Sequence, residues 1–266
     1  MKHLIWIYLD WDRASFPRLD PIWIKERIRI FERFTLASLK NQSFQDFEIC
    51  LLCGQKNRAI TEAHKWDPRV NVLYDRGKKF ISRINDEHLS ISRLDSDDLY
   101  HKHAVKVIDQ VAEISRSPSE MTALIFRKNI LWNRIYHFIG HHYRLCSFPP
   151  FQTKIYPRSI YKDWLSLSST LFITHGKLAR MRFSILDLPK HYVCVVRHGT
   201  NFGHVKKGKN AGSISKEDLE ARHKTGQISA LDDKEARKTL HDFGMTGELI
   251  DEDPLIFKDG EFKHGS

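Results

Sequence analysis

The stretch Phe80–Lys102, FISRINDEHLSISRLDSDDLYHK, decides the fold that we expect for this chain. Within it, His88–Ser92 alternates apolar and polar residues and predicts a short β-strand. The segment Lys102–Ile114 follows with apolar residues at helical spacing. Between the two lies Asp95-Ser96-Asp97-Asp98, which places three carboxylates within four residues. We therefore expect a strand that ends in a carboxylate cluster and leads into a helix.

The carboxylate cluster predicts either a metal site or an acidic helix N-terminus. Three negative charges this close repel one another, and a bound cation would neutralise them. Oxygen ligands without a nearby Cys favour Mg²⁺, Mn²⁺ or Ca²⁺ over zinc. The calcium-loop pattern is excluded, because it needs Gly at its sixth position and Glu at its twelfth. Arg93 beside a bound metal suits a diphosphate, whereas aspartates that only cap a helix need no metal. Both interpretations stay open on this segment alone.

The chain before this cluster alternates strands with helices. The apolar runs at residues 3–9, 47–53 and 70–74 predict buried strands, and residues 22–39 and 59–66 have helical spacing. This order predicts an α/β fold with a mostly parallel sheet flanked by helices. The first strand ends at Asp10, where open α/β sheets bind ligands. Arg13 lies just beyond it and is a candidate phosphate contact, with a surface salt bridge as the alternative.

Beyond Tyr100 the pattern predicts a smaller antiparallel part and a helical C-terminal tail. Residues 122–139 contain ALIF and ILWNRIYHFI, which predict an antiparallel hairpin. We expect further strands at Ser169–Thr174 and Lys190–Arg197, separated by a short helix at His175–Phe183. Lysines 206, 207 and 209 lie in a segment that we expect to be a mobile loop, either a lid over phosphates or a plain solvated loop. Residues 215–240 are charged and mostly helical, with a break expected at Gly226.

Composition narrows the partners and the compartment. The 266 residues carry a formal charge of +10, which favours anionic partners such as nucleotide-sugars, phospholipid surfaces, nucleic acid or acidic glycans. The four cysteines include Cys50 and Cys53, which we expect to be buried thiols on opposite faces of one strand. No apolar run approaches the length of a membrane span. We expect a cytoplasmic protein, with peripheral contact to the inner membrane surface as an option.

Three segments together resemble a known family. Phe31–Cys53 carries a helix, the turn Asn41-Gln42-Ser43 and a strand, and Arg93–Asp98 looks like an Asp-x-Asp motif. Val195–Asn201, VVRHGTN, is similar to a late His-containing segment. These features resemble family-2-type glycosyltransferases with the GT-A (Rossmann-like) fold, most closely a bacterial rhamnosyltransferase-like group. The resemblance implies a GT-A-like domain over residues 1–205, with a nucleotide-binding half at 1–100 and an acceptor half at 101–205. Residues 206–266 would form a basic loop and a helical extension.

The resemblance also implies roles for individual residues. The donor would contact Arg13, Arg93, Asp95, Ser96 and Asp97, and Mn²⁺ or Mg²⁺ would bind Asp95, Asp97 and His198. Without the resemblance, His198 is equally a solvent-facing residue at a strand end. Asp187, in Leu186-Asp187-Leu188-Pro189, is the candidate catalytic base, although turn chemistry before Pro189 favours a structural role. The sequence departs from the family after the second strand, where Cys53-Gly54-Gln55 replaces an Asp that would hold the nucleotide base.

The expected function is a metal-dependent hexosyltransferase. It would move a sugar from a nucleotide-diphosphate donor to a hydroxyl acceptor, which we expect to be a glycan or a lipid-linked acceptor. The first alternative is a nucleotidyl- or phosphotransferase. The sequence has no GxxxxGK phosphate loop, which argues against this alternative. The second is a basic nucleic-acid-binding protein, although the basic residues are dispersed and no RNA-binding signature is present. We expect nucleic acid as a partner only if it is the acceptor.

Overall fold

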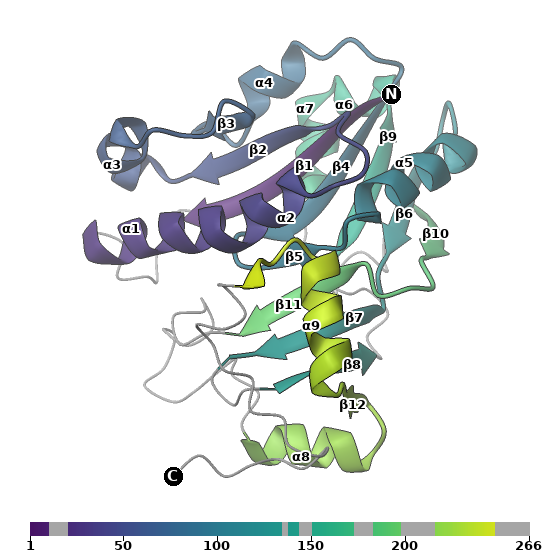
Figure 1. Ribbon diagram of the computed structural model, residues 1–266. Helices are drawn as coiled ribbons and strands as arrows, with labels where there is room; N and C mark the ends of the chain where they lie inside the picture. The colour runs from purple at the N-terminus through teal and green to yellow at the C-terminus, as the bar shows by residue number, and fades with distance from the viewer. Residues whose placement is uncertain (11–20, 135–137, 144–150, 173–182, 198–215, 248–266) are drawn as a thin grey trace.

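The computed structural model describes residues 1–10, 21–134, 138–143, 151–172, 183–197 and 216–247. Within these ranges the strands form a seven-stranded sheet of order β10-β6-β9-β4-β1-β2-β3 and a five-stranded sheet of order β12-β8-β7-β11-β5. Helices cover both faces of the larger sheet, and the smaller sheet lies below it in Figure 1. The expected α/β architecture, a largely parallel sheet flanked by helices, is confirmed.

The strands of the larger sheet, in sheet order, are β10 (Phe183–Asp187), β6 (Met121–Ile125), β9 (Gln152–Pro157), β4 (His88–Asp95), β1 (Lys2–Asp10), β2 (Glu48–Cys53) and β3 (Val70–Leu73). Those of the smaller sheet are β12 (Ile228–Ala230), β8 (Phe138–Tyr143), β7 (Lys128–Asn133), β11 (Val193–Arg197) and β5 (Leu99–Tyr100). The helical segments are α1 (Pro21–Ile30), η1 (Phe31–Leu36), α2 (Ala37–Lys40), η2 (Gln55–Asn57), α3 (Arg58–Ala63), α4 (Lys78–Ser82), α5 (Ala104–Ser115), α6 (Arg158–Tyr161), α7 (Trp164–Leu171), α8 (Lys216–Lys224) and α9 (Asp233–Asp242).

The larger sheet is organised around β1, which pairs in parallel with β2 on one side and β4 on the other. Both faces of β1 are buried, because α1 and α5 cover one face while α6 and α7 cover the opposite one (Figure 1). This is why the strand is almost continuously apolar rather than alternating. The register carries Tyr8 of β1 alongside Asp95 of β4, so Asp10, Cys53 and Asp95 end their strands at the same edge of the sheet. That edge is where the parallel order places a ligand site.

Residues 21–40 form one helix interrupted by a π-helical turn. Pro21 occupies the first turn, where its missing N–H costs nothing. The π turn, η1, widens the helix over Phe31–Leu36 and shifts the side chains that follow. Such turns are rare and frequently occur at functional sites, and this one faces the carboxylate turn at residues 95–98.

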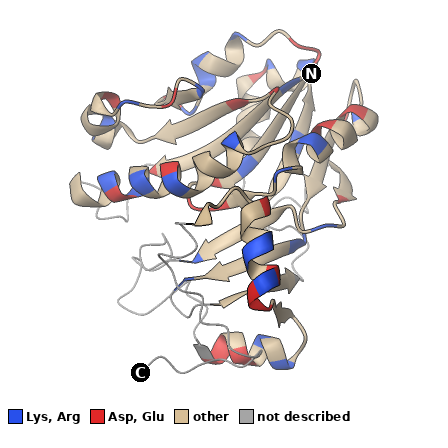
Figure 2. Cartoon of the chain, in the orientation of Figure 1, with Lys and Arg blue, Asp and Glu red and all other residues tan. Residues whose placement is uncertain are grey.

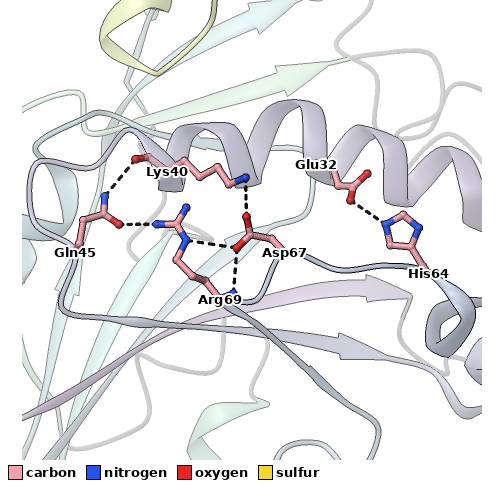
Figure 3. Close-up of polar contacts among 6 residues, drawn as sticks. All are labelled: Glu32, Lys40, Gln45, His64, Asp67 and Arg69. Atoms are coloured by element: carbon pink, nitrogen blue, oxygen red, sulfur yellow. Dashed lines mark hydrogen bonds and ion pairs between the residues drawn. The ribbon is translucent and has the colours of Figure 1, made fainter.

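The outer side of the same helix is tied to the connection between α3 and β3 (Figure 3). Lys40 Nζ lies 2.6 Å from Asp67 Oδ2, and Arg69 donates to Gln45 Oε1 at 2.8 Å. His64 and Glu32 are joined at 2.8 Å further along the helix. Each of these partly exposed contacts is worth at most about 1 kcal/mol, so they orient the helix more than they stabilise it.

The smaller sheet and the C-terminal helix share a second core. Trp132 of β7, Val196 of β11 and Leu240 of α9 are buried together with Phe34 of the long helix. The chain beyond α9 continues to dock through Met245, which is 1% exposed. Helices α8 and α9 confirm the expected helical tail, and Gly226 between them has a positive φ of 70°.

Two strand predictions need correction. The hairpin predicted within residues 122–139 is confirmed for β7 and β8, which pair antiparallel with Trp132 opposite Ile139. Strand β6 is not part of that hairpin, because it joins the larger sheet and β7 the smaller one. Both sides of β6 are taken by β9 and β10, which come later in the chain. Ser169–Thr174 is not a strand, since residues up to Leu171 belong to α7. Asp163 caps the start of that helix, because its carboxylate accepts hydrogen bonds from Leu165 N and Ser166 N. The expected helix at His175–Phe183 lies almost wholly outside the described residues.

Charges and thiols are distributed as the sequence suggests. Cys50 and Cys53 are buried in different clusters on opposite faces of β2, and Cys194 is also buried. Cys146 lies outside the described residues. Lys and Arg are spread over several helices rather than gathered in one stripe in the view of Figure 2. In the part of the chain that the structure describes, none of the helices has the length and apolar character needed to cross a membrane.

Candidate active site

The candidate site is built on the turn at which β4 ends. Asp95 is the last residue of β4, Ser96 to Asp98 form the turn, and β5 begins at Leu99. The N–H of Asp98 donates to Asp95 O at 3.1 Å, which closes the turn. Asp97 and Asp98 are only 7% and 4% exposed, so their charges depend on the groups that surround them.

Arg27 is the principal cation at this turn. Its side chain is 4% exposed, its Nη1 donates to Asp97 Oδ2 at 3.2 Å, and its Nη2 donates to Ser96 Oγ. The sequence interpretation missed this residue. The signal was present, because Arg27 stands on the apolar face of α1 between Ile24, Ile28 and Phe31. A charged residue at such a position is rarely left buried without a partner.

The π turn holds the backbone of the same loop. Thr35 Oγ1 donates to Asp98 O at 2.9 Å and lies 3.4 Å from Asp95 O. One side chain therefore contacts both ends of the carboxylate turn. The widened helix places Thr35 on the loop while Arg27, two turns earlier, contacts Asp97. The helix thus fixes the loop by its backbone and by its charge.

Asp98 links the turn to the smaller sheet. Its Oδ1 accepts a hydrogen bond from Val196 N at 3.0 Å. Burial, and then the neighbouring Asp97 and Asp95, raises the pKa of Asp98 well above its ordinary value. Strand β11 runs antiparallel to β5, with Cys194 beside Leu99, so the chain approaching Arg197 runs alongside the turn. Asp98 therefore acts as a structural residue that brings the segment before His198 to the site.

Arg93 and Asp95 point to the other face of the sheet from Arg27. They are two residues apart on β4, opposite Trp6 and Tyr8 of β1. Arg93 Nη2 donates to Asp95 Oδ1 at 3.3 Å, and its guanidinium carbon lies 5.3 Å from the Tyr8 ring centroid. Asp95 is the most exposed of the three aspartates, with 42% of its side chain accessible. An exposed carboxylate beside a positioned guanidinium is suited to a metal-bound phosphate.

Asp187 ends strand β10 at the same edge and on the same face as Arg93. The register aligns Asp187 with Ile125, then Gln152, then Arg93, and residues directly opposite in a sheet share a face. Three strand spacings separate Asp187 from Arg93, or about 14 Å. Asp187 Oδ2 accepts from Arg127 Nε at 2.8 Å, and 47% of the side chain is accessible.

Asp10 is a further carboxylate at this edge, which the sequence interpretation noted only as a strand end. It is 5% exposed and accepts hydrogen bonds from Gly54 N at 2.8 Å and Asn57 Nδ2 at 2.6 Å. These bonds join the end of β1 to the turn after β2, where relatives were expected to carry a base-binding Asp. The polar groups at this place therefore come from β1 and η2 instead.

The sequence of residues 10–210 matches the family model described as "Putative rhamnosyl transferase". The chain belongs to this family. A comparison with curated proteins found no match. Membership of this rhamnosyl transferase family supports glycosyl transfer as the activity and confirms the resemblance drawn from the Asp-x-Asp and His segments.

Solved structures resemble the chain more distantly. Residues 1–349 of TarS from S. aureus are 16% identical with a TM-score of 0.40, and the match covers 74% of this chain. It covers 60% of that TarS fragment, which has also been solved in complex with UDP. A manganese complex of Rv0371c from Mycobacterium tuberculosis H37Rv is 12% identical with a TM-score of 0.33, over 73% of this chain and 88% of that one. The assignment to the rhamnosyl transferase family rests on the family model.

Two of the predicted site residues lie outside the described residues, namely Arg13 and His198. The same holds for lysines 206, 207 and 209. In the described part of the chain no three His, Cys, Asp or Glu side chains form a metal cluster. The donor set of Asp95 and Asp97 nevertheless fits Mg²⁺ or Mn²⁺. Such ions are commonly held by one or two carboxylates, with water and substrate phosphates completing the shell. The exposed carboxylate of Asp95 is open to such a ligand.

Proposed function

We propose that this chain transfers a hexose from a nucleoside-diphosphate donor to a hydroxyl acceptor. The description of its family makes rhamnose the expected sugar. The observation that carries the proposal is the aspartate turn at the end of β4, buried except at Asp95 and fixed by Arg27, Thr35 and Val196 N. A turn held this firmly presents carboxylates at the ligand edge of a parallel sheet. The family match over residues 10–210 supports the same activity.

In this proposal Asp95 and Asp97 hold Mn²⁺ or Mg²⁺. The cation would supply charge stabilisation for the departing diphosphate. Arg27 orients Asp97 and compensates its charge, because its guanidinium lies 3.2 Å from the carboxylate. Arg93 is held by Asp95 and the Tyr8 ring, and offers its remaining N–H groups to a phosphate. Ser96, Arg13 and His198 complete the proposed donor and metal contacts.

Asp187 is the proposed base, which takes the proton of the acceptor hydroxyl in an inverting reaction. Its position on the same sheet face as Arg93 supports this role, and the hydrogen bond from Arg127 orients its carboxylate. The strand spacing implies that acceptor and sugar together span about 14 Å between the two groups. We propose a glycan or lipid-linked acceptor at this edge, reached from the cytoplasm or the inner membrane surface. Residues 1–205 would form the transferase domain and 206–266 its extension.

The test is product analysis with UDP-, GDP- and dTDP-sugars, each with Mn²⁺ or EDTA. Sugar transfer from these donors releases a nucleoside diphosphate, whereas nucleotidyl transfer from the same donors would release a sugar phosphate. Asp97→Asn should abolish transfer, at least about 100-fold, because an amide keeps the shape but loses the charge that holds the cation. Asp109→Asn on α5 is the matched control and should keep wild-type activity. Full activity of Asp97→Asn, or activity unchanged by EDTA, would contradict the proposed metal site.

A further inference from the structure

A small pocket with polar and apolar lining lies on the face of the larger sheet that α6 and α7 cover, next to the carboxylate turn. Side chains from β1, β4, β9 and α7 line it, and Arg93 brings it within two residues of Asp95. It contains about 290 Å³ of empty volume, part of it open to solvent. Its enclosed part has room for about one water-sized atom. A whole sugar ring does not fit there, but a single ligand oxygen does.

Three of the side chains that line this pocket carry a buried polar atom without a hydrogen-bond partner among the described residues. These atoms are Trp6 Nε1, Arg93 Nε and Gln152 Oε1. Trp6 is 1% exposed and Gln152 is 2% exposed, so bulk water does not reach them. Buried polar atoms in native proteins are almost always paired, either with protein groups or with a bound molecule. Two of the three are donors only.

Lys154 adds a second cation to the same pocket. It is 4% exposed, and its Nζ donates to the backbone carbonyl of Thr170 at 2.6 Å, which leaves two of its three protons for another acceptor. No acidic side chain is among the described residues that line the pocket. Burial, and then the nearby guanidinium of Arg93, lowers the pKa of Lys154 to about 7. A buried lysine without a carboxylate costs free energy, so a partner for it is expected.

From this geometry we propose that the pocket binds one anionic oxygen of a substrate, from a carboxylate or a phosphoryl group. Lys154, Arg93 and the indole N–H of Trp6 would donate to that oxygen. The rest of the ligand would lie in the open mouth, beside Asp95. The inference deepens the proposed function, because it adds an anionic group to the substrate chemistry of the same site. The binding itself does not depend on sugar transfer and is measured separately.

The experiment measures binding of inorganic phosphate and of acetate by calorimetry in EDTA, for the wild type and two variants. Lys154→Met fills the same volume without a charge. Lys162→Met is the matched control, since that lysine also donates to a backbone carbonyl, Ser82 O, but lies outside the pocket. Loss of a charge-assisted bond should weaken phosphate binding about tenfold or more in Lys154→Met and leave Lys162→Met unchanged. Trp6→Phe, which removes the indole N–H together with part of the ring, should give a smaller loss in the same direction.

The outcomes separate the pocket from the transfer activity. Equal phosphate affinity in wild type and Lys154→Met, or no binding of either anion, would overturn the inference and leave water as the occupant. Phosphate binding that UDP with Mn²⁺ abolishes, in a separate titration without EDTA, would assign the oxygen to the donor. Binding of both together would assign it to the acceptor, and each result supports the pocket. Lys154-dependent phosphate binding in a protein that transfers no sugar would refute the proposed function alone.

Discussion

Replacing Arg27 with Met should destabilise the protein strongly through one residue, Asp97. Arg27 and Asp97 have side chains that are 4% and 10% accessible, and they lie 3.2 Å apart. Removing the guanidinium leaves a buried carboxylate without its cation, and breaking such a pair costs roughly 3–5 kcal/mol. Urea denaturation in EDTA measures this loss. Arg29→Met is the control on the same helix, because the Arg29–Glu26 pair is exposed and should contribute less than about 1 kcal/mol.

A double-mutant cycle and a metal titration then locate the effect. Adding Asp97→Asn to Arg27→Met removes the stranded charge, so the double variant should be more stable than the sum of the single losses by about 2 kcal/mol. Mn²⁺ should restore more stability to Arg27→Met than to the wild type, since the cation takes over the neutralisation of Asp97. If Arg27→Met unfolds no more easily than Arg29→Met, the buried pair does not hold the turn. A stability that does not respond to Mn²⁺ in either protein would remove the metal from Asp97.

Two further predictions concern His3 and Asp187. Burial lowers the pKa of His3 to about 3 in the folded state. The unfolded chain binds the same proton near pH 6.5, the ordinary pKa of histidine. The stability held by neutral His3 is therefore complete above pH 6.5 and falls by up to about 5 kcal/mol as pH drops toward 3. The His3→Gln variant should show a flatter acid-denaturation curve, and parallel curves would contradict the buried neutral imidazole. Asp187→Asn should lower kcat of transfer at least about 100-fold with donor affinity unchanged by calorimetry, because a base acts on the acceptor proton. Unchanged kcat would show that Asp187 only pairs with Arg127.

The sequence predicted the first hundred residues well because the deciding signals there are local. Apolar runs predicted β1, β2 and β3, the alternation at His88–Ser92 predicted β4, and helical spacing predicted the long helix. The alternation rule placed Cys50 and Cys53 on opposite faces, as the two core clusters confirm. The π turn was not predictable, since its residues keep an ordinary helical pattern and its form reflects contact with the 95–98 turn.

The errors after residue 120 arose where distant segments decide the pairing. The strands β6 and β7 are separated by two residues, which is typical of a hairpin. Strand β6 nevertheless pairs with β9 on one side and with β10 on the other. The segment at 169–171 has β-branched and aromatic neighbours, but the Asp163 cap had already begun a helix. Local composition does not show which of these pairings is the more stable. The stability of each pairing comes from the burial of side chains, which only the assembled sheet provides.

Arg27 and Lys154 show which sequence signals mark the site before its partners are known. Each is a cation at a position that its element buries, Arg27 on the apolar stripe of α1 and Lys154 between two interior residues of β9. Burying a cation is unfavourable unless an anion compensates it, so each position implies a partner that the local sequence does not name. For Arg27 that partner is Asp97, seventy residues away in the chain. For Lys154 the described residues supply a backbone carbonyl and no carboxylate. Arg27 therefore has its compensating carboxylate within the protein, whereas Lys154 has none among the described residues. This difference is why we expect a substrate oxygen beside Lys154.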